Sequence, residues 1–107
     1  MKLILAIIST DDTKACISAL NKAAFHVTRL ATTGGFLSSG NTTLLIGCED
    51  REVDNAIEII GSQSQRRKET VPATMSTDTS SLVSYPIEVE VGGATVFVLN
   101  VDQFKKL

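Results

Sequence analysis

The sequence predicts an α+β fold, and three observations support this prediction. First, the hydrophobic pattern alternates between short strand-like runs and two longer stretches of helical period. Second, these segments follow one another in the order β-α-β-β-α-β-β. Third, 43% hydrophobic and 21% charged residues are ordinary for a globular domain. A chain of 107 residues is long enough for one such domain with a hydrophobic core.

The first strand and the first helix are expected at the start of the chain. Lys2–Ile8 is almost entirely apolar and precedes a polar turn, which is typical of a buried strand. Residues 9–12 are Ser, Thr, Asp and Asp, which favour a helix N-terminus. The helix should end near Ala24. Between this start and this end, apolar residues recur at helical spacing: Cys16, Ala19, Leu20 and Ala23.

The middle of the chain predicts two strands around a glycine-rich loop. Phe25–Thr32 has alternating residues typical of a strand, and Thr42–Cys48 has an apolar centre. Three glycines lie among the nine residues 33–41, which predicts a loop between these strands.

A second helix and a long loop are expected next. Glu49 and Asp50 favour a helix start, and Gly61 is a plausible stop. The helical stripe is Val53, Ala56, Ile57 and Ile60. Ten of the 24 residues in Gly61–Ser84 are Ser or Thr, and their apolar residues have no sustained period. We therefore predict a fraying helix end followed by a flexible loop over about 62–84.

Two strands are predicted to close the domain. Tyr85–Val91 alternates apolar and acidic residues, Gly92-Gly93 is typical of a hairpin turn, and Ala94–Val101 resembles the returning strand. Residues 102–107 are expected to form a short terminal turn. The whole order is a ferredoxin-like β-α-β-β-α-β plan with an added C-terminal strand, in a single domain over residues 1–107. Both helices must cover one sheet face, and the apolar residues on the other face favour oligomerisation.

Composition and charge restrict the function. A net charge of −2 disfavours general binding to DNA or RNA. His26 is the only histidine, and Cys16 and Cys48 lack the spacing of metal ligands. We predict no catalytic residues, no metal and no cofactor. The first apolar run is too short to span a membrane, and we predict two reduced buried thiols in a cytoplasmic protein.

The glycine loop has two interpretations on residue chemistry alone. Its glycines and hydroxyl side chains suit a loop that cradles a phosphate, and Phe36 could stack on a base. It is equally consistent with a hairpin whose tip packs on a neighbour. His26 and Thr28 share a strand face before this loop, so both could meet one ligand. Arg29 is more typical of a surface or interface ion pair, and Arg66-Arg67-Lys68 of a solvated helix end.

Three long segments carry a family resemblance. Arg29–Gly47 (Ser38 excepted) and Tyr85–Leu99 strongly resemble the PII-like cyclic di-AMP receptors, the DarA/PstA family, and Met1–Ile8 is also similar. The resemblance covers essentially the whole chain apart from residues 61–84. It implies a ferredoxin-like core in a homotrimer, with three cyclic di-AMP sites between neighbouring subunits and no known catalytic role. It also implies that ligand binding rearranges the loops and so relays the signal to an unidentified downstream protein.

The resemblance also implies the residues of the ligand site. Thr28 and Asn41 match positions that hydrogen-bond the ligand, and Gly47 matches a position where the backbone approaches it. The loop over one adenine matches Gly35, Phe36 and Leu37. His26 lies in the same pocket, where the family often has Arg, and Ser38 replaces a residue that is often basic. These two replacements remove charges that grip phosphate. A diverged sensor of another adenine nucleotide, a non-ligand-binding interaction module and an enzyme are therefore the alternatives.

Overall fold

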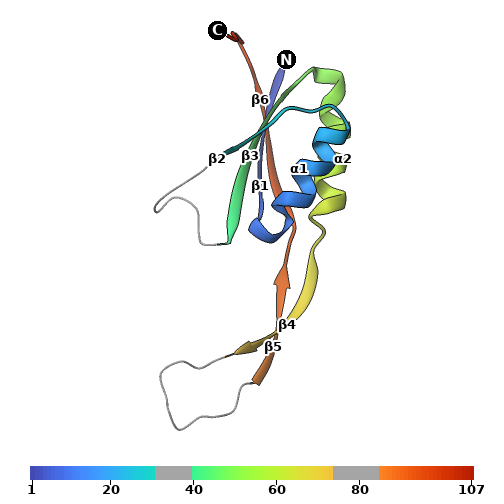
Figure 1. The fold of residues 1–107 in the computed structure, drawn as a ribbon, viewed down its shortest axis with the longest axis vertical. Helices are drawn as coiled ribbons and strands as arrows, with labels where there is room; N and C mark the ends of the chain where they lie inside the picture. Colours follow the sequence, from blue (N-terminus) through green and yellow to red (C-terminus); the bar gives the residue numbers. More distant parts are fainter. Residues whose placement is uncertain (31–39, 74–84) are drawn as a thin grey trace.

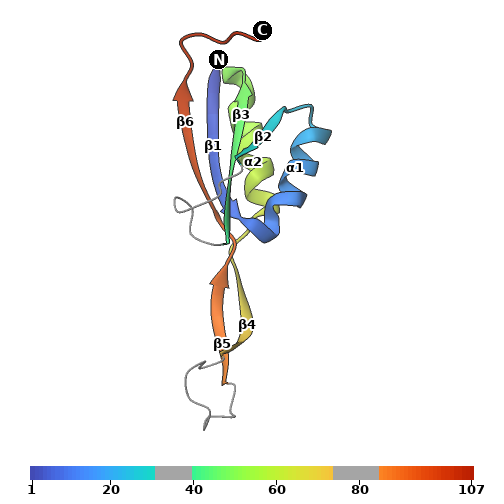
Figure 2. The same cartoon turned by 60° about the vertical axis from the view of Figure 1, so that its left-hand side comes forward.

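A four-stranded antiparallel sheet is the centre of the molecule in a computed structural model, which describes residues 1–30, 40–73 and 85–107. The sheet has the order β2-β3-β1-β6, and every neighbouring pair is antiparallel. Its strands are β1 (Lys2–Ser9), β2 (Val27–Leu30), β3 (Asn41–Cys48) and β6 (Ala94–Asn100). Two helices, α1 (Thr13–Lys22) and α2 (Val53–Gln63), lie on one side of this sheet (Figures 1 and 2). The predicted α+β class is confirmed, and the arrangement is consistent with a small ferredoxin-like fold.

The polar residues predicted to start each helix form a short 3-10 turn that leads into it. Thr10–Asp12 precedes α1 and Asp50–Glu52 precedes α2. Glu49 and Glu52 form a capping box, in which each side chain accepts a backbone N–H bond from the other residue. α2 continues two residues past the plausible stop at Gly61, to Gln63, where the sequence predicts a fraying helix end. At the end of α2, the Ser64 hydroxyl donates to the carbonyl of Ile60 at 2.5 Å.

The end of α1 explains why β2 begins later than predicted. Ala24 adopts a left-handed conformation with φ of 67°. The Ala24 N–H donates to Asn21 and the Phe25 N–H donates to Leu20, which is the hydrogen-bond pattern of a Schellman motif. This turn uses residues 24 and 25, so β2 begins at Val27. Residues 31 and 32, which were also predicted in this strand, lie outside the described residues.

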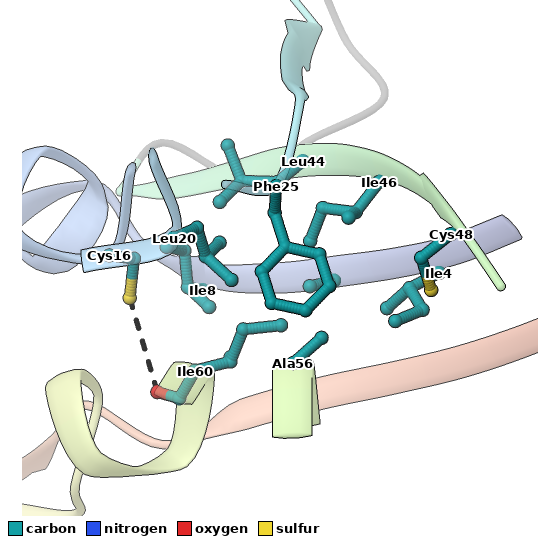
Figure 3. Close-up of a cluster of buried hydrophobic side chains, with 11 residues drawn as sticks. Ile4, Ile8, Cys16, Leu20, Phe25, Leu44, Ile46, Cys48, Ala56 and Ile60 are labelled. Atoms are coloured by element: carbon teal, nitrogen blue, oxygen red, sulfur yellow. Dashed lines mark hydrogen bonds between the residues drawn. The ribbon is translucent and has the colours of Figure 1, made fainter. Parts of the chain in front are cut away.

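The hydrophobic core lies between the sheet and the two helices. Phe25 sits among side chains from both layers in Figure 3, and it is 5% exposed. The core residues are Ile4, Ala6, Ile8, Cys16, Leu20, Phe25, Leu44, Ile46, Cys48, Ala56 and Ile60. Both cysteines are free and buried, as predicted.

Residues 67–73 contradict the prediction of a loop. They form β4 (Arg67–Ala73), which pairs antiparallel with β5 (Tyr85–Val91) in a separate two-stranded ribbon that projects from the sheet (Figures 1 and 2). A two-stranded ribbon packed on no other layer needs no alternating apolar face, so the sequence had no strand signal at these residues. The rest of the predicted loop, residues 74–84, lies outside the described residues.

The predicted hairpin at Gly92-Gly93 is also wrong. β5 pairs with β4, and β6 pairs with β1. β6 is therefore the fourth strand of the main sheet, and the two extra strands are inserted before it. Gly92 and Gly93 have φ of 86° and 83°, and a Cβ at Gly92 would lie 2.4 Å from the Gln65 carbonyl oxygen. The glycine pair is required for a bend that carries the chain from the ribbon into the sheet.

The sheet face opposite the helices carries an apolar surface. Leu5 pairs with Leu45 and Phe97, and Leu3 pairs with Leu99, so these side chains share that face. Phe97 is 52% exposed and Leu99 is 47% exposed. The uncovered face expected from the sequence is thus present.

Candidate functional site

A cavity at one end of the uncovered sheet face brings together three of the predicted site residues. Its volume is about 490 Å³. The lining residues are Met1, His26, Thr28, Gly47, Phe104, Lys105 and Lys106. We call it the His26 cavity.

Strand register explains why Thr28 and Gly47 meet here. Thr28 pairs with Leu45, and Gly47 lies two residues further along β3, so both lie on the face opposite the helices. The intervening Ile46 points to the other face and is fully buried. His26 follows the Schellman motif and lies just before β2, exposed to solvent rather than on the strand as predicted.

Gly47 is the glycine that lines the His26 cavity. Its φ is not among the positive values found for Gly40, Gly92 and Gly93 in the described chain, so the backbone does not require glycine. A Cβ at this position would meet only the end of the flexible Met1 side chain, at 3.3 Å. A glycine within a strand that is not needed for backbone conformation is typical of a place where a ligand or another backbone approaches closely.

The C-terminal tail contributes the positive charge of the cavity. The Val101 N–H donates to the Met1 carbonyl at 3.2 Å, which fixes the start of the tail beside the N-terminus. The Met1 ammonium contacts Asp50 at 3.1 Å, and its hydrogen bond lowers the pKa of that carboxyl. Lys105 and Lys106 then line the cavity. Residues 102–107 form no helical turn, contrary to the prediction.

Asn41 lies away from this cavity in the same chain. It begins β3, whereas Gly47 is six residues further on, roughly 20 Å at the usual strand rise. Asn41 lines a second cavity of about 200 Å³, which also includes Arg66, Gly92 and Gly93. The other predicted ligand residues, Gly35, Phe36 and Leu37, lie outside the described residues, as does Ser38.

Comparison with known proteins decides the family. The model of the cyclic-di-AMP receptor family matches residues 1–107, the whole chain. The chain belongs to this family. A crystal structure of a functionally unknown protein from Pediococcus pentosaceus ATCC 25745 is 42% identical, with a TM-score of 0.74. The match covers 99% of this chain and 96% of that protein.

For a member of the cyclic-di-AMP receptor family, the chemistry of the described residues fits binding. Cyclic di-AMP has two negative phosphates and two adenines, and the His26 cavity offers two lysines, a histidine, a threonine hydroxyl and an aromatic ring. The sequence did not indicate that Phe104, Lys105 and Lys106 line this cavity. The available signal was the Lys-Lys pair, whose position beside His26 depends on the path of the tail.

No metal-binding cluster or reactive thiol is found in residues 1–30, 40–73 and 85–107. These residues contain no group of three His, Cys, Asp or Glu side chains that could hold a metal ion. Burial, together with the Asp12 carboxylate, raises the pKa of Cys16 to about 11. Burial and nearby acidic residues also raise the pKa of Cys48. Neutral buried thiols are poor nucleophiles. No helix in the described residues is long and apolar enough to cross a membrane.

Proposed function

We propose that this chain is a signal-transduction receptor that binds cyclic di-AMP in the His26 cavity and relays binding to a partner protein. The observation that carries this proposal is the convergence of His26, Thr28 and Gly47 with Lys105 and Lys106 in one cavity. The Thr28 hydroxyl would hydrogen-bond the ligand, and the lysines would contact its phosphates. A binding protein, rather than an enzyme, is the role that family membership supports.

The two lysines compensate for charges that the sequence lacks elsewhere. By the family resemblance, His26 and Ser38 stand at positions that are often basic. An ammonium group on the tail supplies permanent positive charge at neutral pH and so replaces part of that attraction. This favours a ligand with two phosphates, and it supports cyclic di-AMP over a sensor that has lost its nucleotide.

We further propose that the complete site forms between subunits of a homotrimer. The uncovered apolar face, with Leu5, Leu45 and Phe97 in one row across the sheet, is the kind of surface that subunit contact buries. Since Asn41 lies roughly 20 Å from Gly47 within one chain, a neighbouring subunit would bring its Asn41, with residues 35–37, to the His26 cavity. We place the protein in the cytoplasm, because both cysteines are free.

A subunit-mixing experiment tests the shared site. Thr28→Ala and Asn41→Ala proteins are prepared separately, unfolded together and refolded as mixed trimers. If the two residues come from different subunits, each mixed trimer has one interface with both native residues, and cyclic di-AMP binding returns at one site in three. If both residues serve the same subunit's site, no mixed trimer regains binding. Sedimentation of each protein checks that the trimer forms.

Competition experiments separate the proposed ligand from the alternatives. Labelled cyclic di-AMP is displaced with ATP, AMP or cyclic di-GMP. The proposal expects displacement only by unlabelled cyclic di-AMP at comparable concentrations. Stronger displacement by ATP or AMP would favour a diverged adenine-nucleotide sensor. A protein that binds none of these nucleotides would be a non-ligand-binding interaction module.

A further inference from the structure

A third cavity lies on the helix side of the sheet, apart from the His26 cavity. It lies between the outer surface of α1 and strand β2, and its volume is about 630 Å³. The lining residues are Thr13, Lys14, Ile17, Ser18, Asn21, Lys22 and Arg29. We call it the α1–β2 groove.

The groove is positively charged in an otherwise acidic protein. Lys14, Lys22 and Arg29 are exposed, and no acidic residue is among the described residues that line the groove. Within residues 1–30, 40–73 and 85–107, none of these three cations belongs to an ion pair. Arg29 pairs in register with the buried Leu44, so it lies on the helix-covered side, opposite Thr28. Arg29 thus forms no ion pair within the described part of the chain, and the interface ion pair also expected for it stays a prediction.

The distance between the cationic residues of the groove matches the distance between side chains of an extended peptide. Lys14 and Lys22 are eight residues apart on α1, or roughly 12 Å along the helix axis. Acidic side chains four residues apart on one face of an extended strand are separated by roughly 13 Å. The partly buried Ile17 provides an apolar contact between the charges.

The edge of the sheet provides a second feature for peptide binding. Among the described strands, β2 pairs only with β3, so one side of its backbone has no strand partner. An extended peptide satisfies such an edge by adding a strand, and pockets beside the edge then select its side chains. Nucleic acid has no peptide backbone and cannot form this pairing, so the free edge of β2 favours a peptide.

From these observations we propose that the α1–β2 groove docks an extended acidic segment of a partner protein. Its alternating carboxylates contact Lys14, Lys22 and Arg29 while its backbone runs along β2. This proposal goes beyond nucleotide binding, and the groove shares no residue with the His26 cavity. Failure of either proposal therefore leaves the other intact.

Fluorescence anisotropy tests the proposal with a fluorescein-labelled heptapeptide of alternating Thr and Glu. A matched peptide has Gln in place of Glu. We expect binding of the acidic peptide at least tenfold tighter than of the neutral one. The variant Lys14→Gln/Lys22→Gln/Arg29→Gln should bind the acidic peptide at least tenfold more weakly than the native protein does. The control variant Lys2→Gln/Arg51→Gln/Lys68→Gln removes the same charge at positions that line neither the groove nor the His26 cavity, and it should bind the peptide normally.

Several results would overturn the proposal. Equal binding of the two peptides, no binding of the acidic peptide, or an equal loss in both triple variants would exclude a specific acidic-peptide groove. A labelled oligouridylate that binds more tightly than the peptide, and loses binding in the groove variant alone, would assign the groove to nucleic acid. Self-association that the groove variant abolishes would assign it to a second copy of the chain.

Discussion

Replacing Gly47 with valine should stabilise the protein and impair ligand binding at the same time. Gly47 is on β3, has no positive φ, and a Cβ there would meet only the flexible end of Met1. Valine fits a strand better than glycine, by about 1 kcal/mol. For a domain of this size, that gain should raise the melting temperature by about 4–8 °C.

The same valine would occupy part of the His26 cavity, which Gly47 lines. Placing extra methyl groups in a filled site costs about 1–3 kcal/mol, so cyclic di-AMP affinity should fall about 5- to 150-fold. Gly47→Ala should give a smaller effect in both measurements. Thermal unfolding and isothermal titration calorimetry measure the two quantities on the same samples.

Gly61→Ala is the matched control. Gly61 lies within α2, and a Cβ there meets nothing within 4 Å. Alanine should therefore stabilise the helix by about 0.5–1 kcal/mol without changing ligand affinity. A lower melting temperature for Gly47→Val would show that the fold itself requires this glycine. Native affinity in a stabilised Gly47→Val protein would show that the ligand does not approach Gly47. Either result would refute the reasoning.

Three further predictions concern the tail, a buried thiol and the ribbon. Lys105→Gln/Lys106→Gln should lower cyclic di-AMP affinity about 5- to 30-fold, because two exposed charges near phosphate are lost. Titration calorimetry should also show that the affinity depends less on salt. Unchanged affinity would show that the C-terminal tail does not contact the ligand. The pKa of Cys16, about 11, exceeds its ordinary value of 9.0, so the unfolded chain loses this proton first. The free energy of unfolding should thus fall as pH rises from 9.0 to 11, by up to about 3 kcal/mol. In urea titrations, Cys16→Ala should make this decline less steep. An equally steep decline in the variant would show that Cys16 does not cause the pH dependence. Asp12 is 7% exposed and accepts two hydrogen bonds from Arg67, at 3.0 and 3.3 Å. Asp12→Asn should cost about 1–2 kcal/mol and speed amide exchange in β4, whereas native exchange rates would show that this ion pair does not hold the ribbon.

The sequence predicted the elements whose hydrophobic period reflects burial. β1 alternates between the helix-covered core and the apolar face, so nearly all of its residues are apolar and its strand signal is strong. In α2, Ala56 and Ile60 are fully buried, as their spacing indicated. When one side of a helix or strand is buried, apolar residues repeat at the period of that element, and this repeat can be recognised in a single sequence.

The errors arose where tertiary contacts rather than burial determine the structure. β4 pairs with β5, and its Arg67 forms an ion pair with Asp12, 55 residues away in the sequence. Neither contact produces a periodic pattern in the sequence. Gly92-Gly93 has the composition of a hairpin turn, but β6 pairs with β1 instead of β5. A local motif predicts a bend without specifying which strand is paired after it.

The candidate site was predictable only in part for the same reason. Family resemblance indicated Thr28 and Gly47, and strand register places them in one cavity. Lys105 and Lys106 reach that cavity through the path of an irregular tail, which no local pattern encodes. Asn41 carries the same resemblance but lies at the other end of β3, and its role depends on assembly rather than on the fold of one chain.

Calorimetric titration of the purified protein with cyclic di-AMP tests the central claim most directly. The account predicts micromolar or tighter binding with one ligand per subunit, and loss of most of that affinity in the Thr28→Ala variant. Sedimentation of the same sample should give a trimer. A folded protein that produces no binding heat with cyclic di-AMP, or that binds it equally well without Thr28, would contradict the account.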